Sequence, residues 1–227
     1  KKYTGEQIAE YFDSIGGSLE VDSQRNSNFL QSTVLAGDFD KSLDYVYQVL
    51  VEPTFPQDQF DKFHHQQLQR IASRAANPQA EILDFWATQL PDTSPYHRTI
   101  LGTTETVSKL TVENCRKYHE KYFVPNNMVL AVFGDIDVDA TLAKLEEMFG
   151  SLPRSESFQW PTFPEHDPLA ATRTEHLQNQ KKNTGMVLMS YPVVSIDDEK
   201  TRSALEVLSA ILTGGSGAGG RLHEELR

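Results

Sequence analysis

Histidine is the side chain from which a metal site in this sequence would have to be built, because the chain has only one cysteine. His64 and His65 are adjacent, so on a helix their side chains point about 100° apart and cannot chelate one ion together. His119, next to Glu120, has the same defect. None of the histidines forms H-x-x-E-H, the inverted zinc motif in which two His one helical turn apart share the ion. The pattern therefore favours surface or interface histidines. The seven are His64, His65, His97, His119, His166, His176 and His223.

Two other segments contain residues that some catalytic or binding sites use. The glycine-rich segment 214–220 precedes a helix, as phosphate-binding loops do, but it lacks the Lys-Ser/Thr pair of a P-loop. Ser216 lies in this segment without the strand-turn-helix context of a nucleophile elbow. Cys115 occupies an apolar position of a helical pattern, which is typical of a small core residue. A flexible connection at 214–220 is the simpler interpretation, ahead of a phosphate site or a serine hydrolase.

Composition and charge narrow the class of protein. Of the 227 residues, 38% are hydrophobic and 23% charged, which is ordinary for a globular protein with a buried core. The net charge of -11 would repel a phosphate backbone, so the sequence predicts no nucleic-acid partner. No apolar run approaches the ~20 residues of a membrane-spanning helix. The sequence does not begin with Met, and we expect both ends to be cut from a longer protein; the compartment is left open.

Local signals predict the first elements of the fold. Thr4 and Gln7 have the spacing of a capping box, and the helix that they begin is stopped by Gly16-Gly17. Strands are predicted at 18–24 and 28–35, joined by a turn. Further helices are predicted from 38 or 40 to Pro53, at 56–75, at 79–90, from 103 or 104, at 111–123 and at 138–149, with an apolar strand at 128–133.

A change of composition divides the chain. Segment 151–170 contains four prolines among Ser, Glu and His, which is typical of a linker between domains. Strands are predicted near 172–178 and 185–191, followed by a helix at 197–212. We therefore predict an α+β fold with an antiparallel or mixed sheet flanked by helices. Residues 1–150 would form most of one domain whose N-terminal part is missing, and 171–227 the beginning of a second, similar one.

Five segments in a fixed order carry a resemblance to a known family. They are Lys1–Gly17, Phe55-Pro56 with the helix after it, Ser94-Pro95-Tyr96 followed by Gly102-Thr103, Tyr122 to Met128 followed by Gly134-Asp135, and Gly214–Arg227. They resemble, in that order, the segment after the inverted zinc motif, the segment of the last zinc ligand, the "HPY…GT" region, the "YxPxNM…VVGD" strand and the "LGGGxSSRLFxxLR" opening of the next domain. These are motifs of the pitrilysin or insulinase family of zinc metallopeptidases, which includes the mitochondrial processing peptidases.

The resemblance implies what this chain holds of a zinc site. It implies a LuxS-like metallopeptidase domain, with the inverted motif lying upstream of residue 1. It places Arg70 where a catalytic domain has its zinc-binding Glu, and Phe63 near the acidic residue one or two turns earlier. A cation cannot coordinate zinc, so no metal ligand and no catalytic residue is expected in the fragment, although zinc is expected in the parent protein. Gly17-Ser18-Leu19-Glu20-Val21, where catalytic domains usually have Gly-x-x-Asn-Ala, agrees with this interpretation.

The first functional interpretation is therefore a zinc-free half of a metalloendopeptidase (a hydrolase), which is inactive alone, closes the substrate chamber and binds extended peptide. Its partners would be the catalytic half of the same protein, or a homologous subunit, and peptide substrates. The resemblance also implies that Arg227 helps to hold the substrate backbone. Two alternatives stay open: an inactive family member that serves as a structural or assembly subunit, and a catalytic half with an altered ligand.

Overall fold

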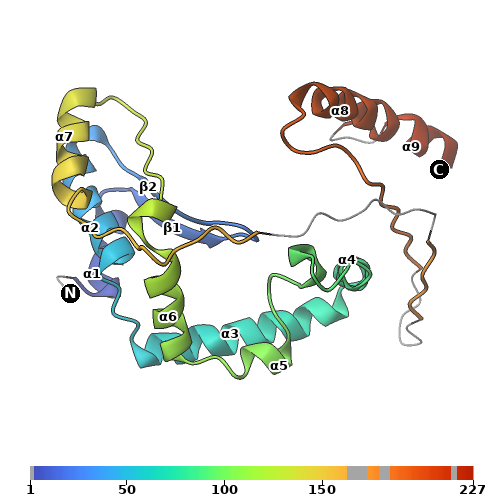
Figure 1. Cartoon of the computed structure of the whole chain (residues 1–227), viewed down its shortest axis with the longest axis horizontal. Helices are drawn as coiled ribbons and strands as arrows, with labels where there is room; N and C mark the ends of the chain where they lie inside the picture. The colour runs from blue at the N-terminus through green and yellow to red at the C-terminus, as the bar shows by residue number, and fades with distance from the viewer. Residues whose placement is uncertain (1–2, 163–172, 179–184, 216–218, 227) are drawn as a thin grey trace. The chain divides into compact units, whose positions relative to one another are not determined.

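A computed structural model describes residues 3–162, 173–178, 185–215 and 219–226 of the chain (Figure 1). It divides into two compact units, 1–164 and 165–227, which are considered separately below. The predicted α+β class is confirmed, since helices pack against a small two-stranded antiparallel sheet in the first unit. The division into domains at 151–170 stays a prediction.

The first unit begins with the predicted capping box. The Thr4 hydroxyl accepts from the Gln7 amide nitrogen at 3.2 Å, and the Gln7 side chain accepts from the Thr4 nitrogen at 2.9 Å. Helix α1 (Gly5–Ser14) follows, and Gly16 at φ +62 ends the turn after it. At Gly17 a Cβ would lie only 2.9 Å from the carbonyl oxygen of Thr33, so a glycine is needed for the chain to return beside that strand.

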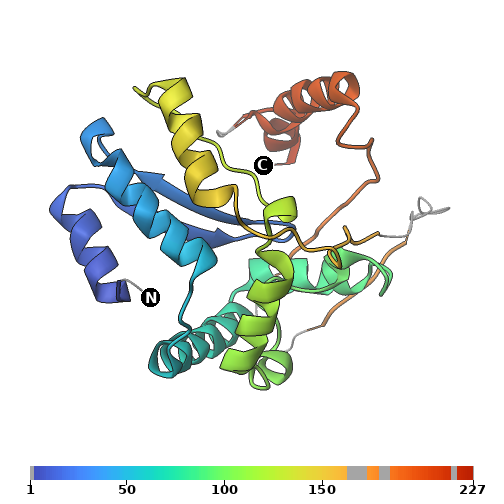
Figure 2. The ribbon, with the colours of Figure 1, turned by 60° about the vertical axis from the view of Figure 1, so that its left-hand side comes forward.

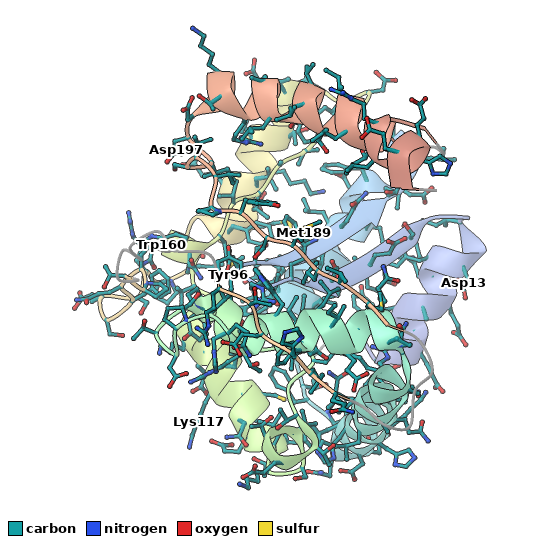
Figure 3. The ribbon with its side chains drawn as sticks, turned by 90° about the vertical axis from the view of Figure 1, so that its right-hand side faces the viewer. Asp13, Tyr96, Lys117, Trp160, Met189 and Asp197 are labelled. Atoms are coloured by element: carbon teal, nitrogen blue, oxygen red, sulfur yellow. The ribbon has the colours of Figure 1, made fainter. Side chains whose placement is uncertain are left out.

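The predicted hairpin is confirmed. Strands β1 (Ser18–Ser23) and β2 (Asn28–Thr33) are antiparallel, with Ser18 opposite Thr33 and Ser23 opposite Asn28. The Gln24 nitrogen donates to the Ser27 carbonyl at 2.8 Å and closes the turn. In Figure 3 the hairpin runs from the end of α1, near the labelled Asp13, toward Tyr96.

The remaining elements of the first unit are helical. They are η1 (Ala36–Asp38), α2 (Phe39–Val51), α3 (Gln57–Ala76), α4 (Pro78–Thr88), η2 (Pro95–His97), α5 (Thr104–Val107), α6 (Val112–Tyr122), η3 (Pro125–Asn127) and α7 (Val138–Phe149). Figures 1 and 2 show α1, α2 and α7 side by side against the hairpin, with α3 to α6 gathered beyond one end of α2. The helices predicted from sequence are confirmed, with shifts of a few residues at their ends.

A small core results from this arrangement. It lies between α1 and α2, where Phe12, Leu43, Tyr45 and Val46 are each less than 9% exposed. Tyr45 has the rings of Tyr3, Tyr11 and Phe12 around it, at centroid distances of 4.5 to 5.9 Å. This core buries apolar surface that a single amphipathic helix could not cover alone. The other buried apolar side chains lie on the later helices: Ala80 and Ala87 of α4, Val107 of α5 and Val112 of α6.

Polar side chains fasten segments distant in sequence. The buried Gln48 amide pairs with the Tyr3 backbone twice, accepting from its nitrogen at 2.8 Å and donating to its oxygen at 2.7 Å. The Asn126 amide binds the Ser155 backbone in the same reciprocal way, at 2.9 and 3.2 Å. In both places a side-chain amide satisfies one donor and one acceptor of a backbone segment that is in neither a helix nor a strand.

The prediction of a strand at 128–133 is wrong. The segment forms no strand in the described structure, and Val129 and Phe133 are 94% and 92% exposed. The predicted strands near 172–178 and at 185–191 do not form either, within 173–178 and 185–191; Thr172 lies outside the described residues. Apolar composition favours a strand, but a strand also needs a hydrogen-bonded neighbour. Within the described residues the only ladder is the one between β1 and β2.

In the second unit, α8 (Glu199–Thr213) confirms the helix predicted at 197–212, and α9 (Arg221–Leu226) follows it. The Asp198 carboxylate caps α8 by accepting from the Thr201 nitrogen at 3.1 Å, and this hydrogen bonding lowers the pKa of Asp198. Gly214 ends the helix in the left-handed conformation at φ +78. No helix in the described parts of either unit has the length and hydropathy needed to cross a bilayer.

Arg25, in the hairpin turn, joins the hairpin to the segment around η2. Its guanidinium donates to the carbonyl oxygens of Arg98 at 2.8 Å and Pro95 at 3.2 Å, and it lies 5.0 Å from the ring centroid of Tyr96. Asn26 and Asn28 add hydrogen bonds to the hydroxyls of Tyr96 and Tyr118, at 3.3 and 3.2 Å. The turn is thus attached to residues about 70 positions later in the chain.

We expect Arg25→Ala to lower the local stability of the hairpin by about 1–2 kcal/mol, because two charge-assisted hydrogen bonds and a cation–π contact are lost. Hydrogen exchange measured by mass spectrometry on full-length protein should show faster exchange in peptides that cover residues 18–33. Arg154→Ala is the matched control, since Arg154 is exposed and no contact of its side chain is seen within the described residues. Equal exchange in the two variants would contradict the role given to Arg25.

Candidate functional site

One face of α3 carries a polar stripe. Gln66, Arg70, Ser73 and Asn77 follow one another at intervals of four, three and four residues, so they lie along the same side of the helix. They border an open hollow of about 580 Å³. The other residues around it are Gln69, Arg74, Ala80 and Leu101. The hollow therefore lies between α3, the start of α4 and the loop after η2.

Asn77 sets the sharp turn between α3 and α4. It is the C-cap of α3 and, at the same time, the N-cap of α4. Its side-chain oxygen accepts from the nitrogens of Gln79 at 2.9 Å and Ala80 at 3.3 Å. Pro78 occupies the first position of α4, where a missing amide hydrogen costs nothing. The sequence Asn-Pro thus ends one helix and begins the next without an intervening loop.

Two side-chain contacts fix the walls of the hollow. Arg74 of α3 donates to both carboxylate oxygens of Asp84 in α4, through Nε and Nη2, each at 2.9 Å. The hydrogen bonds to Asp84 raise the pKa of Arg74, against a smaller opposite effect of burial. Gln67 donates to the Leu101 carbonyl at 3.0 Å and so attaches the loop after η2, the third wall, to α3. The bidentate Arg74–Asp84 pair restrains direction as well as distance.

Arg70 is exposed on the polar stripe, and no hydrogen bond or ion pair of its guanidinium occurs within the described part of the chain. Phe63, nearly two turns earlier on α3, is also exposed, at 61%. Arg70 thus differs from Arg74, whose charge is balanced by Asp84. The proposal that Arg70 stands at the position of a zinc ligand rests on the family resemblance, but its side chain does reach an open hollow.

Two histidines, His64 of α3 and His119 of α6, donate hydrogen bonds to backbone carbonyl oxygens. His64 Nε2 donates to the Val107 carbonyl at 2.8 Å, and its ring stacks on Phe60 at 5.3 Å between centroids. His119 Nε2 donates to the Leu50 carbonyl at 2.7 Å, and its ring stacks on Phe123 at 4.8 Å. In both rings Nε2 therefore carries a proton, and Nδ1 is the nitrogen that keeps a lone pair.

The other histidines are dispersed. His97 Nδ1 donates to the Leu90 carbonyl at 2.9 Å while its Nε2 lies 3.4 Å from Asp92, and His65 faces the Gln69 amide at 3.0 Å. His166 lies outside the described residues. Among the residues that the structure describes, no three His, Cys, Asp or Glu side chains come together as a metal site would require. The described side chains therefore do not assemble the three or four ligands of a zinc site.

Three further predicted features can be placed only in part. Cys115 is half-buried in α6, and this burial raises the pKa of its thiol. Within segment 214–220, Gly214 ends α8 and Gly220, at φ +78, precedes α9, whereas Ser216 lies outside the described residues. Arg227 also lies outside them, so its substrate-binding role stays a prediction.

Arg70 was predicted as a notable position from the sequence, whereas the hollow around it was not. Gln66, Ser73 and Asn77 carry a signal that could have been read, because polar residues at helical spacing from Arg70 mark one face of α3. Leu101 carries no such signal, since it is brought to α3 by the hydrogen bond from Gln67.

Comparison with known proteins identifies the family to which the chain belongs. Residues 109–227 match the family model described as the peptidase M16 inactive domain, and residues 1–104 match that of insulinase, peptidase family M16. The chain belongs to the insulinase (M16) family of peptidases. The resemblance identified from sequence motifs is thereby confirmed.

Individual relatives of this family member are distant. An uncharacterized zinc protease of Rickettsia felis is 29% identical over 67% of this chain and 37% of its own length. A Helicobacter pylori protein called a non-peptidase homolog is 23% identical over 97% of this chain and 50% of its own. A crystal structure of a peptidase M16 inactive domain from Pseudomonas fluorescens matches the fold with a TM-score of 0.77, at 19% identity, over all of this chain and 54% of the other. The chain spans between a third and a half of the length of curated relatives such as these.

We expect His119→Gln to lower the free energy of unfolding by about 1 kcal/mol, because the hydrogen bond to Leu50 and the stacking on Phe123 are weakened. The zinc content of the full-length protein should stay the same. Thermal unfolding and elemental analysis of one preparation test both points, with the exposed His176→Gln as control. A fall in zinc caused by His119→Gln alone would show that this histidine is a ligand.

Proposed function

We propose that this chain is the zinc-free half of a zinc metalloendopeptidase, which helps to enclose the substrate chamber and binds extended peptide. The observation that carries the proposal is Arg70. At the position where the resemblance implies a zinc-binding carboxylate, α3 presents a guanidinium bordered by glutamine and serine side chains. A cation there repels zinc and favours a role in binding over one in metal chemistry.

The comparisons support this proposal in two ways. More than half of the chain matches a model described as an inactive domain. Relatives from Rickettsia and Streptomyces are called zinc proteases and are two to three times longer than the region they share with this chain. We infer that zinc in the parent protein is held by residues outside this chain. The partner would then be the catalytic half of the same protein or a homologous subunit.

The hairpin offers a way to bind extended peptide. Within the described residues, β1 and β2 are paired only with each other, so each has one edge of backbone donors and acceptors without a neighbouring strand. A peptide that adds a strand to such an edge is held through its main chain, and its sequence then matters little. This would suit a protease chamber that accepts varied peptides.

A second function is favoured by one relative. The Helicobacter pylori protein named as a non-peptidase homolog aligns with nearly all of this chain. An inactive family member of that type would act as a structural or assembly subunit, and its parent would hold no zinc in either half. Zinc content separates the two functions.

The test is zinc content and peptidase activity of the full-length parent, measured beside the isolated chain. We expect about one zinc per parent molecule, cleavage of an unstructured fluorogenic peptide and loss of cleavage after chelation. Arg70→Gln in the parent should leave the zinc content unchanged, because Arg70 is not a ligand. A parent without zinc and without cleavage would favour the structural subunit. Stoichiometric zinc in the isolated chain would overturn the zinc-free assignment.

Arg227 allows a separate prediction for the parent enzyme. If its guanidinium donates to substrate carbonyls, Arg227→Ala should lower kcat/KM for peptide cleavage about tenfold, with the zinc content unchanged. Arg221→Ala, six residues earlier at an exposed position of α9, is the control. Equal kinetics in the wild type and Arg227→Ala would identify Arg227 as a surface residue.

A further inference from the structure

The hollow beside α3 is rich in hydrogen-bond donors and poor in negative charge. The whole chain has 32 acidic and 21 basic residues. Around the hollow the balance is reversed, since its eight bordering residues include two arginines and no aspartate or glutamate. A local reversal of this kind in an acidic protein favours the binding of an anion there.

The two arginines are not equivalent. Arg74 gives two hydrogen bonds to Asp84, so its charge is already balanced. Arg70 lies one helical turn earlier on the same helix, and at this spacing its positive charge and that of Arg74 repel each other. Within the described residues Arg70 has no acidic partner. Asp84 neutralises one guanidinium and leaves the other available to a second carboxylate.

The neighbours of Arg70 complete a donor group. Gln66 precedes it by four residues and Ser73 follows it by three, so both flank it on the same stripe. No hydrogen bond of the Gln66 or Ser73 side chain occurs in the part of the chain that the structure describes. The amide of Gln69, by contrast, is directed to His65 at 3.0 Å. Three adjacent side chains therefore have donors free for a ligand.

We propose that this hollow binds a carboxylate group of an extended peptide, either an Asp or Glu side chain or the C-terminal carboxylate. Arg70 donates to the two carboxylate oxygens in a bidentate arrangement, and Ser73 and Gln66 donate from either side. A volume of about 580 Å³ accommodates a side chain with the backbone that bears it. This inference rests on the proposed peptide-binding function and adds to it a preference for acidic peptides.

The experiment uses the full-length protein, a zinc chelator to prevent cleavage, and one fluorescently labelled peptide in four forms. The forms carry Glu or Gln at one internal position, combined with a free or an amidated C-terminus. Fluorescence anisotropy at low salt gives the four dissociation constants. We expect at least one carboxylate form to bind about tenfold tighter than the doubly neutral form, and the two singly acidic forms identify which carboxylate the hollow takes.

Arg70→Gln should abolish this difference without changing the affinity for the neutral peptide. Arg70→Lys should retain part of it, since a lysine keeps the charge but not the bidentate geometry. Arg116→Gln is the matched control, because Arg116 is likewise an exposed arginine on a helix of the first unit, and it should behave as the wild type. Circular dichroism of each variant establishes that the fold is intact.

Two results would overturn the inference, and they differ in what they say of the proposed function. If all four peptides bind with similar affinity, or if Arg70→Gln keeps the preference for acid, the hollow is not the carboxylate site while peptide binding itself stands. If none of the four peptides binds, both the hollow and the peptide-binding function are wrong.

Discussion

Arg25 provides the contact on which the arrangement of the first unit depends. The hairpin packs on α1 and α2, whereas α3, α4, α5 and η2 form a second group linked by contacts of their own. Arg25 reaches from the hairpin turn to the backbone of Pro95 and Arg98 in that second group and lies over the ring of Tyr96. A guanidinium suits this position because its several donors serve two carbonyl oxygens while its flat face contacts an aromatic ring. The loop after η2, which also forms a wall of the α3 hollow, begins at this contact.

Elements with local signals could be predicted from the sequence. The structure contains the predicted capping box of Thr4 and Gln7, the Gly16-Gly17 stop, the hairpin and the helix predicted at 197–212. Each depends on interactions between residues a few positions apart, which a pattern of residue types specifies. The helices were predicted for the same reason, because an apolar stripe at helical spacing is visible in one dimension.

The strand predicted at 128–133 does not form, and the physical reason is a different one. Its run of apolar residues indicates a strand, but pairing depends on another segment of backbone whose position no local pattern gives. The exposed Val129 and Phe133 show that hydrophobicity alone did not bury the segment in the described structure. The candidate site was only partly predictable in the same sense. Arg70 could be found from its alignment with a family motif, whereas the hollow needed the turn at Asn77 and the reach of Gln67 to Leu101.

Asn77 has a consequence for how this region opens. Because it caps the end of α3 and the start of α4, neither end can fray without releasing hydrogen bonds that belong to the other. The Arg74–Asp84 pair spans the same corner. We therefore expect the last turns of α3 and the first turns of α4 to unfold together, as one foldon in native-state exchange. The two walls that α3 and α4 give to the hollow would then open and close together, whereas the wall at Leu101 is held separately by Gln67.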